Sequence, residues 1–243
     1  MKKFKRFKFS YKETNTTILT EDVEFYKVAV KAILEARSEI EEYIRLNPDF
    51  LISYEPLNCP KCTGKKIIRN MCYSARLANV GPMASVAGAI AQFAVDKMID
   101  AGANVAVVDN GGDIAIYSDE ELKVGIYPSK FALLIPPSEK IAICTSSGKI
   151  GPSVSFGWAD CATIIAENAC IADAFATALG NAVKTSEKED IKKILSDFYF
   201  KNREYIKGAI VVIDEILAFA GEIPKIVSAE FKEDLITKPP SRD

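Results

Sequence analysis

Hydrophobic and polar positions follow two different periods along the first fifty residues. Residues 4–20 alternate apolar and polar side chains and are rich in threonine, which predicts one or two strands. Residues 22–46 instead place apolar side chains at helical spacing between charged ones: Val23, Tyr26, Val30, Ile33, Leu34 and Ile40. The pair Asn47-Pro48 ends this helix, and residues 51–70 are expected to form a connection that contains proline and cysteine.

A second helix is predicted over residues 80–103, which read VGPMASVAGAIAQFAVDKMIDAGA. Gly81-Pro82 opens it, because proline is favoured in a first helical turn, and Gly102 closes it at the position after the last turn. One face of this helix carries only small residues, which allows another backbone to approach closely: Ala84, Ala87, Gly88 and Ala91.

Short apolar segments dominate the rest of the chain. Residues 104–117, NVAVVDNGGDIAIY, read as a strand, an Asn-Gly turn and a second strand. Further strands are predicted at 123–127, 131–135, 141–145, 153–158 and 162–166, then helices at 168–183 and 188–201, then late strands within 206–219. Hairpin-joined strands between helices favour an α+β fold over a regular βαβ series. We expect a single compact domain over residues 1–236, with short antiparallel strands and packed helices, followed by a frayed tail at 237–243.

Composition narrows the class of protein. The 243 residues are 49% hydrophobic and 26% charged with a net charge of -2, as in a globular domain, so no general attraction to nucleic acid is expected. No apolar run approaches the roughly 20 residues of a membrane span, so no membrane partner is expected. The basic start MKKFKRFKFSYK lacks the apolar segment that follows in a signal peptide. A cytoplasmic location is therefore expected.

The chain contains no histidine. Zinc proteases, Ser-His-Asp hydrolases and Cys-His proteases are thereby excluded in their usual forms. Proton transfer would use carboxylates, lysine, tyrosine, cysteine or metal-bound water, and a metal site would be oxygen-rich or built from thiolates alone.

Six cysteines are present: Cys59, Cys62, Cys72, Cys144, Cys161 and Cys170. In a cytoplasmic chain of this length they do not indicate a disulfide framework. Cys59-Pro-Lys-Cys62 is one CxxC pair, whereas a structural zinc site usually needs two. The pair is interpreted as incidental or weakly structural thiols, with redox, sulfur or metal chemistry as the alternative. Cys144 and Cys170 lie in apolar segments and are expected in the core.

The helix predicted at 168–183 carries two polar groups on one face. Asp173 and Thr177 stand one turn apart among alanines, and a buried carboxylate is costly unless it is paired, hydrogen-bonded or bound to a metal. In one interpretation Asp173 caps a neighbouring loop and Thr177 bonds to its own helix. In the other the pair is part of the oxygen shell of Mg²⁺, which usually takes one or two protein ligands and completes its shell with phosphate and water.

Two further segments have the composition of ligand-binding loops. Asp109-Asn110-Gly111-Gly112-Asp113 is either an ordinary hairpin turn or a turn whose backbone N–H groups face a phosphate. Cys144-Thr145-Ser146-Ser147-Gly148 follows a strand and is rich in hydroxyls, so it is either a solvated turn or a loop that approaches a ligand's phosphates.

In this order, VDNGGDIAI, TSSG and IADAFATALGNA resemble the ApbE superfamily, the FAD:protein FMN transferases, over roughly residues 80–185. The resemblance implies an ApbE-like fold and a Mg²⁺-dependent cleavage of FAD that moves FMN onto a threonine or serine of an acceptor protein. It implies Asp173 and Thr177 as metal ligands, with a backbone carbonyl from residues 81–88. The flavin (FAD or FMN) or other phosphorylated small molecule would contact a larger set: Gly81, Gly88, Gly111, Gly112, Asp113, Thr145, Ser146 and Ser147.

GPMASVAGAIAQ is more similar to a small branch of this superfamily from archaea and anaerobic bacteria, whose reaction is not established. The transferases carry a lysine where Ala87 stands and a histidine-containing segment where this chain has KIGPSVSFGWAD. Trp158 or Phe156 is considered as a replacement stacking contact. Two alternatives therefore stay open beside transferase chemistry: an accessory protein in sulfide assimilation and homocysteine formation, to which Cys59 and Cys62 would matter, and a protein that keeps the fold without a ligand.

Overall fold

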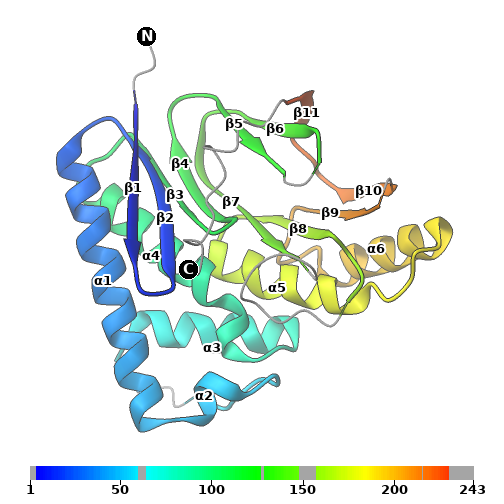
Figure 1. The fold of residues 1–243 in the computed structure, drawn as a ribbon, viewed down its shortest axis with the longest axis horizontal. Helices are drawn as coiled ribbons and strands as arrows, with labels where there is room; N and C mark the ends of the chain where they lie inside the picture. The colour runs from blue at the N-terminus through cyan, green and yellow to red at the C-terminus, as the bar shows by residue number, and fades with distance from the viewer. Residues whose placement is uncertain (1–3, 60–63, 127–128, 148–156, 215, 230–243) are drawn as a thin grey trace, which may run out of the picture.

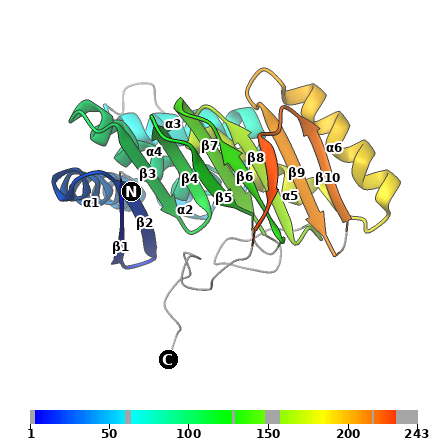
Figure 2. The same cartoon turned by 90° about the horizontal axis from the view of Figure 1, so that it is seen from above.

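The computed structural model describes residues 4–59, 64–126, 129–147, 157–214 and 216–229. Its main sheet has eight antiparallel strands in the order β1-β2-β3-β4-β7-β8-β9-β10, visible side by side in Figure 2. Their bounds are Lys5–Tyr11, Thr14–Thr20, Val105–Asn110, Asp113–Ser118, Ser138–Ser146, Cys161–Ala166, Gly208–Ile213 and Ile216–Gly221.

A smaller sheet covers one face of the main sheet. It has the order β11-β6-β5, with bounds Lys225–Ser228, Phe131–Ile135 and Leu122–Gly125. Side chains of the main sheet alternate between two cores, as the two-residue period of a strand requires. In β4 and β7, Ile116 and Ile143 face the small sheet, whereas Ala115 and Ala142 face the helices. Small residues on the helix side let the helices pack close to the strands.

Helices form the other layer (Figure 1). α4, Val86–Asp100, packs on β3 and β4, and α5, Ala169–Ala182, packs on β7 and β8 and beside α4. Around them lie α1 (Val23–Leu46), α2 (Asp49–Ile52), α3 (Lys66–Ala78), the 3₁₀ turn η1 (Pro82–Ser85) and α6 (Lys188–Asn202). Among the described residues no single helix is long and apolar enough to cross a membrane. α3 and the η1–α4 segment meet the length and composition criteria only when taken together, and the chain bends by 104° between them.

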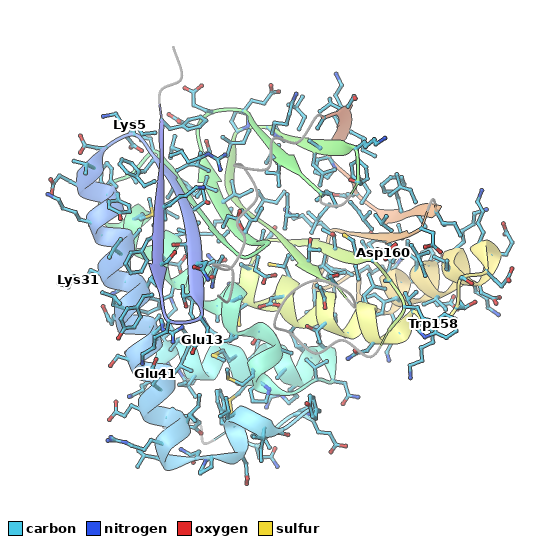
Figure 3. The ribbon with its side chains drawn as sticks, viewed as in Figure 1. Lys5, Glu13, Lys31, Glu41, Trp158 and Asp160 are labelled. Carbon is cyan, nitrogen blue, oxygen red and sulfur yellow. A yellow bond between two sulfur atoms is a disulfide. The ribbon has the colours of Figure 1, made fainter. Side chains whose placement is uncertain are left out.

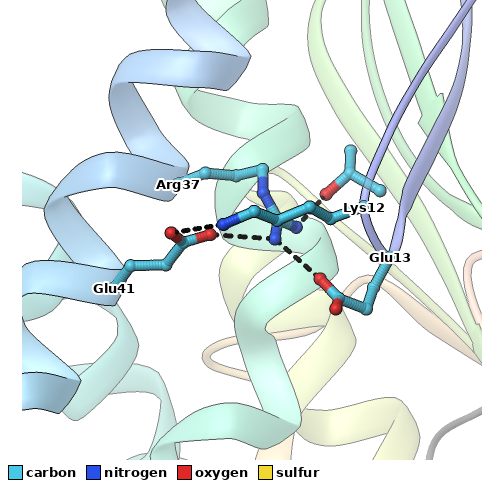
Figure 4. A network of polar contacts seen from close by, with 5 residues as sticks. Lys12, Glu13, Arg37 and Glu41 are labelled. Atoms are coloured by element: carbon cyan, nitrogen blue, oxygen red, sulfur yellow. Dashed lines mark hydrogen bonds and ion pairs between the residues drawn. The ribbon is translucent and has the colours of Figure 1, made fainter.

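An ion-pair network joins the β1–β2 hairpin to α1 (Figure 4). The Arg37 guanidinium lies 2.7 Å from the Glu13 carboxylate and 3.0 Å from that of Glu41, and it also donates to the Thr14 hydroxyl. Lys12, at positive φ in the turn, pairs with Glu41 at 2.8 Å. The Arg37 side chain is mostly buried, but its partner carboxylates Glu13 and Glu41 reach solvent. Pairs with solvent-exposed carboxylates contribute little, about 0–1 kcal/mol each when fully exposed, so the main effect of the network is to orient the hairpin on α1.

Most predicted elements are confirmed, and the fold is α+β. The long first helix, the 104–117 hairpin, the helix over 168–183 and both late strands lie where the pattern places them. The 51–70 connection is wrong at both ends, because it contains α2 and the first turn of α3, whose amphipathic face buries Ile67, Ile68 and Met71. The predicted helix at 80–103 begins with the 3₁₀ turn η1 instead of a regular α-helical turn.

The remaining differences concern the C-terminal half. Residues 157–158 are not in a strand, and 153–156 lie outside the described residues, so the strand predicted at 153–158 is not found in its described part. β11 was not expected; it pairs with β6 in the small sheet. The tail at 237–243 lies outside the described residues, and the boundaries of the domain stay a prediction.

The cysteines need one correction. Cys59 is not an incidental thiol: it forms a disulfide with Cys72 on α3, across a sequence separation of 13 residues. Cys62 lies outside the described residues. Cys144 and Cys170 are buried free thiols, as predicted, and Cys161 is a third.

Candidate functional site

The start of α5 lies directly against the start of α4. Asn168 begins α5 as its N-cap, accepting a hydrogen bond from the Ile171 N–H at 3.2 Å. The Gln92 side chain of α4 accepts another from the Ala169 N–H at 2.9 Å. A Cβ added to Gly88 would lie 2.2 Å from the Ala169 carbonyl oxygen, which no packing permits. Gly88 is therefore glycine because the α5 backbone occupies the place of a side chain.

Asp173 projects from α5 to the first turn of α4. Its carboxylate is 8% exposed and accepts a hydrogen bond from the Gly88 N–H at 2.9 Å. Ser85, at the N-cap position of α4, does not cap its own helix, since its hydroxyl donates to the Pro82 carbonyl. Asp173 thus satisfies a free N–H of another helix and places its negative charge at the positive end of that helix.

Asp113 adds a second buried carboxyl group. It begins β4 opposite Cys144 of β7, is 8% exposed, and accepts a hydrogen bond from the Thr145 N–H at 3.3 Å. Burial raises the pKa of Asp113 well above its ordinary value, and the charges of Asp173 and Asp109 raise it further. Burial also raises the pKa of Asp173 to about 7, against the opposing effect of the Gly88 and Ala87 N–H groups. Two acids in this position favour either a bound proton or a cation.

Thr177 lies one turn beyond Asp173. Its hydroxyl oxygen stands 3.4 Å from the Ala84 carbonyl oxygen of η1, and it does not bond to its own helix as one interpretation expected. Ala84 falls within the 81–88 range expected to supply a carbonyl ligand. Nearby, the Asn110 amide donates to the Ala87 carbonyl at 3.1 Å and fixes the β3–β4 turn to α4.

The donor set fits a hard cation. Across the described part of the chain, no group of three or more His, Cys, Asp or Glu side chains is arranged to hold a metal. Asp173, Thr177 and the Ala84 carbonyl present oxygen atoms alone at the α4–α5 junction. Oxygen is the ligand type that Mg²⁺ takes, and this ion usually keeps water or phosphate in several of its positions.

The Gly111-Gly112 turn is open. Both glycines have positive φ, at 72° and 106°, and a Cβ added to either would meet no atom within 4 Å. The Gly112 N–H donates to the Asp109 carboxylate, which fixes the turn. Gly81 differs, because a Cβ there would lie 1.8 Å from the Ser53 carbonyl oxygen. Gly81 and Gly88 thus have packing reasons of their own, and their contact with a cofactor stays a prediction.

The hydroxyl segment at the end of β7 divides between the two faces of the sheet. The Thr145 hydroxyl lies 2.8 Å from that of Thr163, on the face of the small sheet. Ser146 alternates with Thr145 and shares the helix face with Cys144 and Asp113. Its hydroxyl is buried and has no hydrogen-bond partner among the described residues; the contact of Ser146 with a ligand stays a prediction. Ser147 is half-buried, and Gly148 lies outside the described residues.

Trp158 lies at the C-terminal end of α5 (Figure 3). Its backbone N–H donates to the Val183 carbonyl there, and the residue is 58% exposed. Ten helical residues, about 15 Å, separate that end from Asp173. Trp158 therefore does not stack at the carboxylate pair, and Phe156 lies outside the described residues.

Sequence reasoning missed two of the groups that build the site. Asn110 was considered only as a turn residue, although its amide holds the turn against Ala87. Gln92 was not singled out, although its side chain fixes the start of α5. A polar residue within an otherwise apolar helix was the available signal for Gln92.

A family model and individual proteins of similar length match most of this chain. Residues 1–213 match the family described as AbpE bacteria. The UPF0280 protein of Archaeoglobus fulgidus is 62% identical over 234 residues, covering 96% of this chain and 99% of the relative. The UPF0280 protein of Methanothrix thermoacetophila is 46% identical, covering 95% and 98%.

Two solved structures share the fold. The flavinyl transferase ApbE of Pseudomonas stutzeri, in its apo form, has a TM-score of 0.52 at 10% identity and covers 90% of this chain and 94% of its own. The ApbE protein of Thermotoga maritima has a TM-score of 0.55 at 12% identity and covers 97% and 100%. At these identities the likeness shows the fold alone.

Proposed function

Since the chain belongs to the UPF0280 family of archaeal proteins and has an ApbE-like fold, we propose that it binds a divalent cation together with a flavin or related phosphorylated nucleotide. The carrying observation is the group formed by the Asp173 carboxylate, the Thr177 hydroxyl and the Ala84 carbonyl at the α4–α5 junction. Mg²⁺ is the cation that this oxygen set suits best, and FAD or FMN the ligand that the solved relatives' names suggest.

Each residue has a definite task in this proposal. Asp173 and Thr177 hold the cation, whose charge would offset that of the ligand's phosphates. The open Gly111-Gly112 turn leaves room for the ligand's phosphates, since no atom lies within 4 Å of a Cβ added to either glycine; the Gly112 N–H itself already donates to Asp109. Ser146, whose buried hydroxyl has no partner within the described ranges, would donate it to the ligand on the same face of the sheet.

FMN transfer to an acceptor protein is the possible reaction of this site, in analogy with the named transferases. Two features of the sequence argue for slow transfer or none. Ala87 stands where the transferases carry a lysine, and the 243 residues contain no histidine. These losses favour the second candidate, a binding protein without transferase activity; the suggested link to sulfide assimilation rests on the resemblance alone.

The test is FAD binding, followed by flavin fluorescence, with Mg²⁺ and with EDTA. The wild-type protein is expected to bind FAD more tightly with Mg²⁺, and Asp173→Asn is expected to lose this difference. Asp100→Asn is the matched control, because Asp100 is an exposed carboxylate at the far end of α4. Equal FAD binding with EDTA and in Asp173→Asn would refute the proposal. Chromatography of the same mixtures for AMP shows whether FAD is cleaved.

A further inference from the structure

The Cys59–Cys72 disulfide fastens an irregular segment to the helix layer. Residues 53–59 form neither helix nor strand. The Ser53 N–H donates to the Asp49 carbonyl and so ends α2, whereas the Ser53 hydroxyl, Glu55 and Cys59 hydrogen-bond within the segment. Cys59 is half-buried and packs against the edge of the core, whereas Cys72 is 7% exposed on α3. The disulfide is the covalent attachment that holds this segment to α3.

The same segment touches the backbone that leads to the candidate cation site. The Ser53 carbonyl lies against Gly81 so closely that a Cβ at Gly81 would overlap it. Gly81 accepts a hydrogen bond from the Ala84 N–H at 3.1 Å, and the carbonyl of Ala84 faces Thr177. The attached segment therefore supports η1 from outside while η1 presents a carbonyl to the site inside.

A second contact joins α3 to α5. The Ser74 hydroxyl of α3 lies 3.3 Å from the Cys170 sulfur of α5, three residues before Asp173. α3 also packs along η1. Cys59 is thus linked through Ser53 and Gly81 to η1, which carries Ala84. Cys72 is linked through α3 to α5, which carries Asp173 and Thr177.

We propose that the Cys59–Cys72 disulfide is a reversible redox site whose reduction weakens divalent-cation binding at Ala84, Asp173 and Thr177. The coupling rests on the proposed function; the redox site itself does not. Its reaction partner is a dithiol reductant. Reduction releases the Cys59 end of the 53–59 segment from α3. The segment then stays anchored only through Ser53 at the end of α2, the contact of Ser53 with Gly81 loosens, and η1 can move its Ala84 carbonyl away from Thr177.

The dithiol supplies the two electrons that reduce the disulfide. A thiolate of the reductant attacks the more exposed Cys59 sulfur, the disulfide bond breaks, and the Cys72 sulfur leaves with the bonding pair and takes up a proton. The second thiolate of the reductant then attacks its own sulfur in the mixed disulfide, and Cys59 leaves as a thiolate that is protonated. The reductant is oxidised to a disulfide and the protein gains two thiols.

The experiment uses the full chain with Cys62→Ser, which leaves five cysteines of the six in the sequence. Native protein is treated with N-ethylmaleimide before and after dithiothreitol, and adducts are counted by intact mass. We expect no adducts before reduction and two afterwards, at Cys59 and Cys72, because Cys144, Cys161 and Cys170 are buried. Reoxidation should restore the first result.

Two readouts test the coupling. Calorimetric Mg²⁺ affinity is expected to fall about fivefold or more on reduction, the size of an ordinary coupling between sites. Hydrogen exchange at the Ala84 amide should accelerate, since its bond to Gly81 loses support. Cys59→Ser combined with Cys62→Ser should match the reduced state under all conditions, and circular dichroism should show that the helices persist.

Each outcome decides a separate point. Two adducts before reduction, or global unfolding on reduction, would overturn the redox proposal. So would an Mg²⁺ affinity that is measurable and equal in the oxidised and reduced states. If Mg²⁺ binds in neither state and Asp173→Asn changes nothing, the proposed function fails. Exchange at Ala84 then decides alone whether the disulfide controls η1, and unchanged exchange would overturn the proposal as well.

Discussion

Gly88→Ala tests the packing on which the site depends. In an ordinary helix this change stabilises by roughly 0.5–1 kcal/mol, because alanine has the higher helix propensity. At this position the added Cβ would lie 2.2 Å from the Ala169 carbonyl oxygen and 2.8 Å from the Asp173 Cβ. Neither atom is the end of a flexible side chain, so α4 and α5 must separate.

The clash decides the sign of the change. Overpacking of a close contact costs about 1–3 kcal/mol, which exceeds the gain in propensity. In a chain of this size each kcal/mol lowers the melting temperature by about 2–4 °C. Because the added Cβ meets backbone at 2.2 Å, the cost lies at the upper end of this range, about 3 kcal/mol. Subtracting the propensity gain leaves a net loss of about 2–2.5 kcal/mol and a melting temperature lower by roughly 4–10 °C, together with weaker Mg²⁺ binding, because Asp173 moves with α5.

Thermal unfolding followed by circular dichroism and Mg²⁺ calorimetry give the two readouts. Gly102→Ala is the control at the other end of α4, where φ is 96° and an added Cβ meets no atom within 4 Å. Its backbone strain costs about 1–2 kcal/mol, but it leaves the site untouched. A Gly88→Ala protein that is more stable than wild type, or that binds Mg²⁺ equally well, would refute the described α4–α5 contact.

Three further predictions concern the site chemistry. Mg²⁺ affinity should rise between about pH 6 and 8, because the Asp173 pKa is raised to about 7 and the proton on Asp173 competes with the cation. Without the cation, the free energy of unfolding should fall as the pH rises from about 4 to 7, because in that range the folded state keeps the Asp173 proton and the unfolded state does not. Thr177→Val should weaken Mg²⁺ binding in calorimetry and leave the melting temperature within a few degrees, whereas Thr177→Ser should keep the binding. FMN transfer to a threonine-bearing acceptor, followed by intact mass, should be slow or absent because Ala87 replaces the lysine of the transferases.

The elements that local patterns specify could be predicted from the sequence. The β3–β4 hairpin and the α5 face follow from residue type and period, although the turn residues are Gly111-Gly112 and Asn110 still belongs to β3. The resemblance carried by VDNGGDIAI and IADAFATALGNA is confirmed by the family and the fold. The pairing of Cys59 with Cys72 could not be predicted, because spacing does not determine which thiols meet.

Only the part of the site on α5 could be predicted from the sequence, for a similar reason. Asp173 and Thr177 lie one turn apart on one helix, so the sequence shows them together. Their partners come from distant segments: Ala84 from η1 and Asp113 from β4. A backbone carbonyl also leaves no trace in residue identity, which is why only a range could be named for it.

Calorimetric titration of Mg²⁺ into wild type and Asp173→Asn tests the central claim most directly. The asparagine oxygen can still accept the Gly88 N–H, so the helix cap and the fold should persist while the charge is lost. We predict a saturable Mg²⁺ site in the wild type and an affinity at least about tenfold lower in the variant, a difference of about 1.4 kcal/mol. Equal Mg²⁺ affinity in two equally folded proteins would contradict the account.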